Sequence, residues 1–321
     1  MTRRALITGG AGFVGQWLAR ALLRQGWRVT SAGIGARPDA GSMPAEERDA
    51  VEWLLVDVRH QDDITRALDA SRPDAIFHLA GISFVPDAQG DPALAYEVNV
   101  IGAARLLADI RRRRRAGTLD PAVLVVGSAE QYGRHEPDEL PLPETAEQRP
   151  LTVYAASKAA QEVVALEAAR SDGVRVVATR SFNHSGPRQP AQFLLPALVR
   201  RALALRASGD SALRIGNTDT VRDFLHVADV ADAYVALAER GVAGVVYNVC
   251  SGQGYTVAEL AARVLDLAGV DARLEQDPAL VRPVEVPALV GDPARIRAAA
   301  GWSPTRSTDD IILDLIHAAT R

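Results

Sequence analysis

Residues Thr8–Gly15 read TGGAGFVG, and this stretch decides the fold of the chain. It follows the apolar run Ala5–Thr8 and opens a helical pattern over Phe13–Gln25, so its glycines fall between a predicted strand and a predicted helix. Glycines there let the chain turn tightly, bring backbone against a pyrophosphate and pack helix on strand. The unpaired N–H groups that begin the helix would face the phosphates. The residues expected at a dinucleotide are Gly9, Gly12, Phe13, Val14 and Gly15.

The first half of the sequence alternates apolar strand-like runs with helical patterns. This rhythm predicts an α/β fold, a Rossmann doubly wound parallel sheet with helices on both faces. After Arg180, prolines become frequent and the elements shorten, which indicates a smaller mixed α/β domain. We expect domains at 1–180 and 181–321, with a segment near 219–249 returning to the first. The further expected strands are Arg28–Ser31, Trp53–Val56, Ala75–Leu79, Val123–Val126 and Arg175–Thr179, and the expected helices include Asp63–Ser71 and Ala93–Arg112.

Composition narrows the possible functions. The net charge of the 321 residues is −4, so no global basic field attracts nucleic acid. The five arginines Arg111–Arg115 are interpreted as a cationic helix C-terminus, with a nucleic-acid contact as the alternative. The single cysteine, Cys250, lies in a strand-like run and indicates a packed thiol, without a disulfide or a cysteine-built metal site. No apolar run reaches membrane-spanning length, so we expect a cytoplasmic protein with no membrane partner.

Of the 36 lysine and arginine residues, only Lys158 is a lysine. It follows Tyr154 by four residues, which places both side chains on one face of a predicted helix. A tyrosine has a pKa near 10, and a nearby ammonium would lower that pKa by stabilising the phenolate. The ammonium could also donate to ribose hydroxyls, for which the planar fork of arginine is poorly suited. The spacing predicts a catalytic pair.

Ser128 ends the fifth predicted strand, and Glu130 follows two residues later. Doubly wound folds place their chemistry at the carboxyl ends of the strands. The Ser128 hydroxyl could therefore orient a substrate oxygen beside Tyr154. Glu130 is either an acid/base group or a solvated loop residue.

Several further residues follow strand ends and are expected to line the cofactor. The second strand ends without the acid that would bind the 2′-hydroxyl of NAD, which favours NADPH, with NADH possible. Arg37 either meets a 2′-phosphate or is a solvated loop residue. Asp57, next to Val58, could receive the adenine amino group, and Asn99 either braces the sheet or lines the cofactor site. Small residues after the fourth strand would admit the cofactor, in the stretch Leu79, Ala80 and Gly81.

The motifs above resemble those of the extended short-chain dehydrogenase/reductases that act on nucleotide sugars, and the resemblance runs essentially the whole length. Arg180–Pro187 is similar to the R-x-F-N-H-x-G-P segment of the GDP-sugar branch. Val221–Phe224 resembles its V-R-D-F, and Arg282–Pro287 its R-P-x-E-V-P. Val126–Gly133 resembles the G-S-x-E-x-Y-G of the GDP-4-keto-6-deoxy-mannose reductases.

The resemblance implies that the second domain binds a GDP-linked keto-deoxy sugar. Asn183 would contact the sugar or its diphosphate, Arg222 and Arg282 would clamp the diphosphate, and Glu285 would accept from the guanosine ribose. Ser83 and Arg188 complete the expected substrate set. The implied reaction is hydride transfer from NAD(P)H to the C4 carbonyl, giving GDP-D-rhamnose. Tyr154 would donate the proton, Ser128 orient the carbonyl, Lys158 tune Tyr154 and hold the ribose, and Glu130 support them.

Other functions stay open at this point. The related GDP-mannose 4,6-dehydratases carry a hydroxyl residue and a glutamate at the same spacing as Ser128 and Glu130, and Arg188 matches the dehydratase segment. The short chain and the missing arginine-rich segment after the second strand favour the reductase. A C4 epimerase and a cofactor-sensing protein without chemistry are the remaining alternatives. Relatives pair two long helices per subunit, so we expect a homodimer through Ala93–Arg112 and Tyr154–Arg170.

Overall fold

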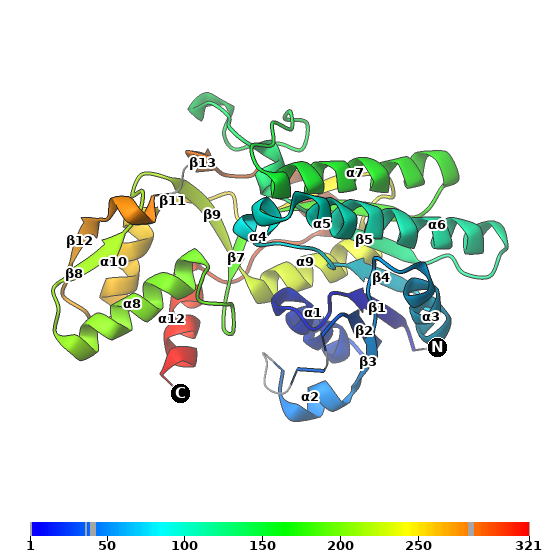
Figure 1. The fold of residues 1–321 in the computed structure, drawn as a ribbon, viewed down its shortest axis with the longest axis horizontal. Helices are drawn as coiled ribbons and strands as arrows, with labels where there is room; N and C mark the ends of the chain where they lie inside the picture. Colours follow the sequence, from blue (N-terminus) through cyan, green and yellow to red (C-terminus); the bar gives the residue numbers. More distant parts are fainter. Residues whose placement is uncertain (1, 36, 39–42, 282–285, 321) are drawn as a thin grey trace.

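The structure is a computed structural model that describes residues 2–35, 37–38, 43–281 and 286–320 (Figure 1). Its main sheet has seven strands, all parallel, in the order β10-β6-β5-β4-β1-β2-β3. Strand order reverses between β1 and β4, so the predicted α/β Rossmann fold is confirmed. The strands are β1 (Arg4–Thr8), β2 (Arg28–Gly33), β3 (Val51–Leu55), β4 (Ala75–His78), β5 (Ala122–Ser128), β6 (Val176–Ser181) and β10 (Val246–Val249).

Both faces of this sheet are buried, which explains why its strands are apolar throughout. Ile7 of β1 points into a core shared with α1 (Phe13–Arg24), α9 (Val227–Arg240) and α11 (Ala294–Ala300). Its neighbour Leu6 points to the opposite face, where helices including α6 and α7 pack. Figure 1 shows α6 and α7 side by side on one face of the sheet and α1 on the other. The helices packed on the second face are α3 (Gln61–Ser71), α6 (Gly102–Arg115) and α7 (Val153–Asp172).

The expected helix Ala93–Arg112 is interrupted, so that prediction was wrong in detail. Helix α5 (Pro92–Tyr96) passes into a π-helical segment, Glu97–Ile101, before α6 begins at Gly102. Apolar periodicity does not distinguish a π turn from an α turn, and π turns are frequent at functional sites. The buried Asn99 lies in this segment.

Helix α6 continues to Arg115, so the five arginines form its last turns and the helix ends beyond the expected Arg112. The five arginines pair with carboxylates of α3, α6 and α7 and of the loop after α6. The pairs are Arg111 with Glu167 and Asp172, Arg112 with Asp109, Arg113 with Asp69 and Asp109, Arg114 with Asp120, and Arg115 with Asp172. This supports the interpretation of a cationic helix C-terminus.

A second region covers one end of the strands. Its core is formed mainly by α8 (Leu194–Ser208), α10 (Val257–Ala268) and α12 (Thr308–Ala319). A small sheet joins this region to the first, since β7 (Asn183–Ser185) pairs with β9 (Val221–His226) directly after β6 ends. The chain then returns to the main sheet, where α9 packs beside α1 and β10 pairs with β6. The remaining elements are α2 (Ala45–Asp49), α4 (Val85–Gly90), β8 (Ala212–Ile215), β11 (Gly254–Thr256), β12 (Arg273–Gln276) and β13 (Ala288–Leu289).

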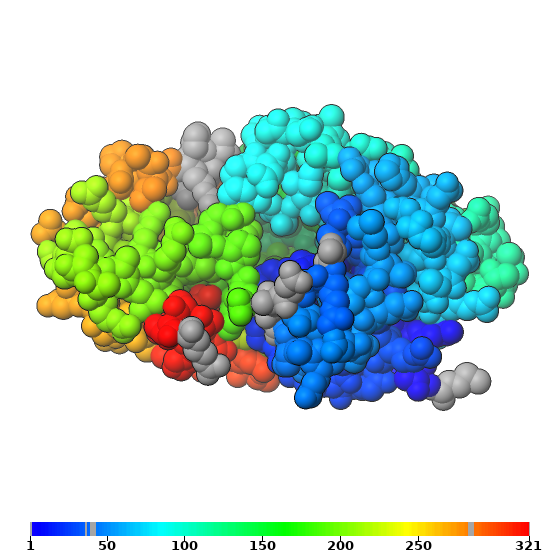
Figure 2. Space-filling view, turned by 60° about the horizontal axis from the view of Figure 1, so that its bottom comes forward, coloured from blue at the N-terminus to red at the C-terminus, as the bar shows by residue number. Residues whose placement is uncertain are grey.

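Figure 2 shows the molecule hollowed near its centre, where the N-terminal part in blue, the segment around α4 and α5 in cyan and the green part of the second region meet. The carboxyl ends of the parallel strands open toward the second region, so the candidate site lies where the two regions meet.

Candidate functional site

The glycine turn is packed so tightly that only glycine fits at two of its positions. Gly9 has φ +72°, and a Cβ there would lie 2.8 Å from the backbone nitrogen of Ala80. A Cβ on Gly15 would lie 2.5 Å from the Cα of Gly10, so the first turn of α1 rests directly on the loop. The N-cap residue, Gly12, has no side chain to satisfy the N–H groups that begin α1. These groups form a cradle for an anion such as a pyrophosphate.

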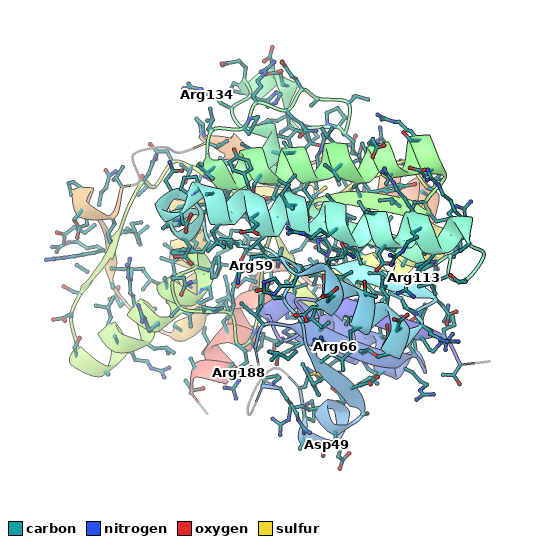
Figure 3. All side chains as sticks on the ribbon, turned by 45° about the vertical axis from the view of Figure 1, so that its right-hand side comes forward. Asp49, Arg59, Arg66, Arg113, Arg134 and Arg188 are labelled. Carbon is teal, nitrogen blue, oxygen red and sulfur yellow. The ribbon has the colours of Figure 1, made fainter. Side chains whose placement is uncertain are left out.

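The residues expected around the adenosine are engaged with local partners. Arg37 forms an ion pair with Asp49 of α2. The Asp57 carboxylate accepts three bonds from the guanidinium of Arg59, of 2.6, 2.9 and 3.0 Å, and a fourth from its backbone N–H. These bonds hold the pKa of Asp57 below its ordinary value. Figure 3 labels Asp49 on α2 and Arg59 above it. Contacts of Arg37 and Asp57 with a cofactor stay predictions.

The Asn99 side chain connects two parts of the candidate site through hydrogen bonds. Its amide accepts from the backbone N–H of Ile82 at 2.8 Å and donates to the carbonyl of Ile82 at 3.2 Å and to the Ser157 hydroxyl at 2.8 Å. It thereby ties the loop after β4 to α7. A Cβ on Gly81 would lie 2.8 Å from the Asn99 Oδ1 and 3.4 Å from the Lys158 Nζ, so Gly81 lets this loop pass close to both. Val58 is buried and packs against Gly102 at the start of α6.

Lys158 is almost fully buried, with 4% of its surface exposed. Its Nζ donates to the carbonyl of Val126 on β5 at 2.8 Å and to the Gln161 Oε1 at 2.9 Å. Burial lowers the pKa of its ammonium to about 8. The buried His78 at the end of β4 lies within the field of this charge, and burial together with that charge lowers its pKa to about 3. His78 is therefore neutral beside a mostly charged lysine at pH 7.

Ser128 and Tyr154 are brought together from β5 and α7. Burial raises the pKa of Tyr154 to about 12, the nearby Ser128 side chain opposes that rise, and the charge of Glu130 adds to it. The expectation that Lys158 lowers the pKa of Tyr154 was wrong for the protein alone, because the ammonium is directed at Val126 and Gln161. Glu130 lies near enough to act on Tyr154 through its charge, and its role as an acid/base group or a solvated loop residue stays a prediction.

The second-half motifs reach the glycine turn. His184 of β7 stacks on Phe13, with ring centroids 6.4 Å apart and an interplanar angle of 7°. Asn183, half-buried, is its neighbour on the same strand. Phe84, next to the exposed Ser83 in the loop after β4, meets Phe193 edge-on at 5.8 Å. Two ring contacts therefore join the first region to the second around the strand ends.

The three arginines expected at the substrate differ in their surroundings. Arg222 lies on β9, and its guanidinium donates to the carbonyl of Val221 at 2.9 Å. Arg188 is exposed and has φ +72°, a strained conformation for a residue other than glycine and one that recurs at functional sites (Figure 3). Arg282, like Glu285, lies outside the described residues. The structure places Arg188 and Arg222 in the second region, and their contacts with a substrate stay predictions.

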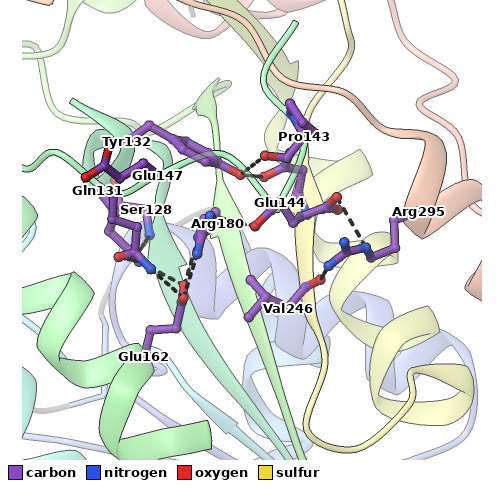
Figure 4. A network of polar contacts seen from close by, with 12 residues as sticks. Ser128, Gln131, Tyr132, Pro143, Glu144, Glu147, Glu162, Arg180, Val246 and Arg295 are labelled. Atoms are coloured by element: carbon purple, nitrogen blue, oxygen red, sulfur yellow. Dashed lines mark hydrogen bonds and ion pairs between the residues drawn. The ribbon is translucent and has the colours of Figure 1, made fainter. Parts of the chain in front are cut away.

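Sequence reasoning missed a buried polar network beside Ser128, drawn in Figure 4. Gln131 follows Ser128 by three residues, Glu162 follows Lys158 by four, and Arg180 is the next-to-last residue of β6. Glu162 and Arg180 form a two-bond ion pair with side chains 4% and 5% exposed. A signal was present, since Tyr154, Lys158 and Glu162 recur at intervals of four on one helix face.

Three further observations concern residues outside this network. Cys250 is fully buried, and burial raises the pKa of its thiol, as suits a packed side chain. Among the described residues, no group of three or more histidine, cysteine, aspartate or glutamate side chains is arranged to hold a metal ion. In the same part of the chain, every helix is too short or too polar to cross a membrane.

The geometry can be compared with known proteins. Residues 6–315 match the model of the GDP-mannose 4,6 dehydratase family. The chain is 34% identical to the GDP-6-deoxy-D-mannose reductase of Pseudomonas aeruginosa, covering 95% of this chain and 93% of that protein. It is 29% identical to the GDP-6-deoxy-D-talose 4-dehydrogenase of Aggregatibacter actinomycetemcomitans, covering 91% and 90% of the two chains. The structure of RMD from P. aeruginosa complexed with NADPH superposes with a TM-score of 0.81 at 30% identity, covering 99% and 100% of the two chains.

The match of the family model spans nearly the whole chain, as do the similarities to these relatives. They agree with the Rossmann sheet. The resemblance stated from the sequence is confirmed: this chain belongs to the GDP-mannose 4,6 dehydratase family of the extended short-chain dehydrogenase/reductases that act on nucleotide sugars.

Proposed function

We propose that this protein uses NADPH to reduce the C4 keto group of a GDP-4-keto-6-deoxy-hexose, giving GDP-6-deoxy-D-mannose, which is GDP-D-rhamnose. The observation that carries this proposal is the convergence of Ser128 at the end of β5 with Tyr154 and Lys158 of α7, at the strand ends that adjoin the glycine turn and with the Lys158 ammonium bonded to β5. The relative of 34% identity over 95% of the chain is named for this reductase activity.

The state of the phenol suits a reduction. With its pKa raised to about 12, Tyr154 is protonated at neutral pH, which is the form that can donate a proton to an alkoxide forming at C4. The Ser128 hydroxyl holds the substrate oxygen beside that phenol. Lys158 keeps most of its charge at pH 7, and its ammonium would hold the ribose hydroxyls of a bound cofactor.

The glycine cradle fits a dinucleotide cofactor. The free N–H groups that begin α1 and the close approach allowed at Gly9 suit a pyrophosphate. A reduced nicotinamide bound here would supply the hydride to the carbonyl carbon. NADPH is favoured over NADH, because β2 ends at Gly33 with no carboxylate to bind a 2′-hydroxyl and because the related RMD structure is a complex with NADPH.

Product analysis tests the proposal. Incubation with GDP-4-keto-6-deoxymannose and NADPH should oxidise one NADPH for each GDP-6-deoxymannose formed, with the configuration at C4 read by NMR. A talose-configured product would keep the reductase and change the stereochemistry. An absence of NADPH oxidation with this substrate would overturn the assignment.

The second candidate is the 4,6-dehydratase, which is favoured by the description of the matching family and by Arg188. It predicts conversion of GDP-mannose with NADP to a 4-keto-6-deoxy product without net consumption of the cofactor. The reductase predicts no conversion of GDP-mannose. Running both substrates against one enzyme preparation separates the two.

We further propose that the protein forms a homodimer through α5, α6 and α7. Three large apolar side chains are exposed along these helices and the π segment, Tyr96 at 39%, Ile101 at 44% and Val163 at 65%. Their burial against a second copy would remove this apolar surface from water. Light scattering should give twice the 34.2 kDa of one chain, and Val163→Glu should shift the mass toward one chain. A wild-type mass near one chain would remove the dimer.

A further inference from the structure

Gln131 holds the backbone of Ser128. It lies in the 3₁₀ turn Ala129–Tyr132, for which Ser128 is the N-cap, and its side chain is fully buried. Its Oε1 accepts the N–H of Ser128 at 2.8 Å. Ser128 in turn accepts the N–H of Glu130 with its hydroxyl at 3.2 Å, so the turn that carries both candidate catalytic residues is closed by these two bonds.

The other end of the same amide reaches the catalytic helix. The Nε2 of Gln131 donates to Glu162 at 2.9 Å. Glu162 lies on α7, two helical steps of four residues beyond Tyr154, on the face that also carries Lys158. One side chain therefore connects the backbone of Ser128 to the helix that positions the phenol.

The Glu162 carboxylate accepts four hydrogen bonds from three side chains. Besides Gln131, it accepts from Gln148 at 2.7 Å and from Arg180 at 2.7 and 2.9 Å. The guanidinium of Arg180 also lies 4.7 Å from the ring centroid of Tyr132, the last residue of the 3₁₀ turn. A buried carboxylate with this many donors has one stable orientation, so it is a fixed anchor for Gln131.

The backbone makes room for this link. A Cβ on Gly127 would lie 2.5 Å from the Oε1 of Gln131 and 2.3 Å from the carbonyl of Thr179. The strand residue before Ser128 therefore has to be a glycine for the amide to reach its place. The fold therefore supplies both the space for the Gln131 amide, at Gly127, and its fixed partner, Glu162.

We propose that Gln131 and Glu162 are positioning residues that set the place of the Ser128 hydroxyl relative to the Tyr154 phenol, an inference that rests on the function proposed above. Neither residue touches the reacting atoms. Gln131 acts through Ser128, and Glu162 acts by fixing Gln131 to α7. Small displacements of a catalytic group are costly, about 100-fold for 1 Å.

A double-mutant cycle tests the link. Gln131→Met keeps the length of the side chain and removes its three bonds, to Ser128, Gln148 and Glu162, so kcat should fall about 10- to 100-fold while KM for the sugar nucleotide changes little. In a Ser128→Ala background the same change should alter kcat by less than about twofold, because the group that Gln131 positions is gone. If Gln131→Met fails to fold, Gln131→Asn, which keeps the amide on a shorter stem, enters the same cycle.

Gln148→Leu is the matched control. It removes one bond to the same carboxylate and one from the Gln131 amide but leaves the bonds that join Ser128, Gln131 and Glu162, so it should lower the melting temperature while keeping kcat close to the wild-type value. Equal effects of Gln131→Met in the wild-type and Ser128→Ala backgrounds would overturn the positioning role. The proposed function fails separately, if the wild type does not turn over the sugar nucleotide or if Tyr154→Phe keeps full kcat.

Discussion

Helix α7 carries ion pairs in two different environments. In its N-terminal half, called the buried end, Glu162 pairs with Arg180, and both side chains are at most 5% exposed. At its far end, Asp172 pairs with Arg115, whose side chain is 75% exposed, and with Arg111. The chemistry of the pairs is the same, but the first pair is enclosed beside Ser128 and Tyr154, while the second joins two helix ends at the surface.

The difference shows where in this protein an ion pair fixes the geometry of neighbouring groups. At the surface, water competes for both partners and little free energy depends on the pair. In the interior, losing one partner leaves a charge without solvent, so the pair fixes geometry even where its net contribution to stability is small. The five consecutive arginines are prominent in the sequence, yet the isolated Arg180 matters more.

The largest expected effect is chemical and belongs to the buried end. Tyr154→Phe removes the proton donor and should lower kcat by roughly 10²–10⁴-fold, measured by NADPH oxidation at saturating substrate. Tyr96→Phe, on the exposed side of α5, is the control and should keep the wild-type rate. Near-full turnover by Tyr154→Phe would show that the buried end of α7 does not supply the proton donor.

The next effect compares the two ion pairs directly. Arg180→Leu leaves Glu162 buried without its cation and should cost about 3–5 kcal/mol of unfolding free energy, measured by urea denaturation. The matched change Arg115→Leu should cost far less. Equal losses from the two variants would show that burial does not distinguish the two ends.

A third effect concerns the pH dependence of stability. Burial lowers the pKa of Lys158 from 10.5 in the unfolded chain to about 8 in the folded protein. Between these two pH values, Lys158 is therefore protonated in the unfolded chain and mostly neutral in the folded protein. The stability of the wild type should therefore rise with pH across this window relative to Lys158→Met, by up to about 3 kcal/mol. A difference in unfolding free energy that stays flat from pH 8 to 10.5 would contradict the buried charge.

The smallest effect belongs to the exposed end. Arg115→Ala should change the free energy of unfolding by about 0–1 kcal/mol, and that difference should shrink as salt is added. Denaturation at low and high ionic strength measures it. A loss that is large and insensitive to salt would place Arg115 in a buried network that its exposure does not indicate.

The sequence predicted what depends on neighbours along the chain. Alternating apolar runs predicted the Rossmann sheet, because each period reports which face of a strand or helix is buried. The glycine turn at Gly9–Gly15 and the Tyr154–Lys158 spacing are equally local, since four residues along a helix define one face. The π segment at Glu97–Ile101 was missed, because one extra residue in a turn does not disturb an apolar pattern visibly.

Only the tertiary structure brought Gln131, Glu162 and Arg180 together, because their contacts depend on how β5, α7 and β6 pack. It also reversed the expected pKa shift of Tyr154, since the direction of the Lys158 ammonium and the burial of the phenol are properties of packing. By itself, the sequence determined the fold and the glycine turn, and it predicted that Tyr154 and Lys158 share one helix face. The tertiary structure decided how these groups are held and charged, because desolvation and long-range hydrogen bonds exist only once the chain is folded.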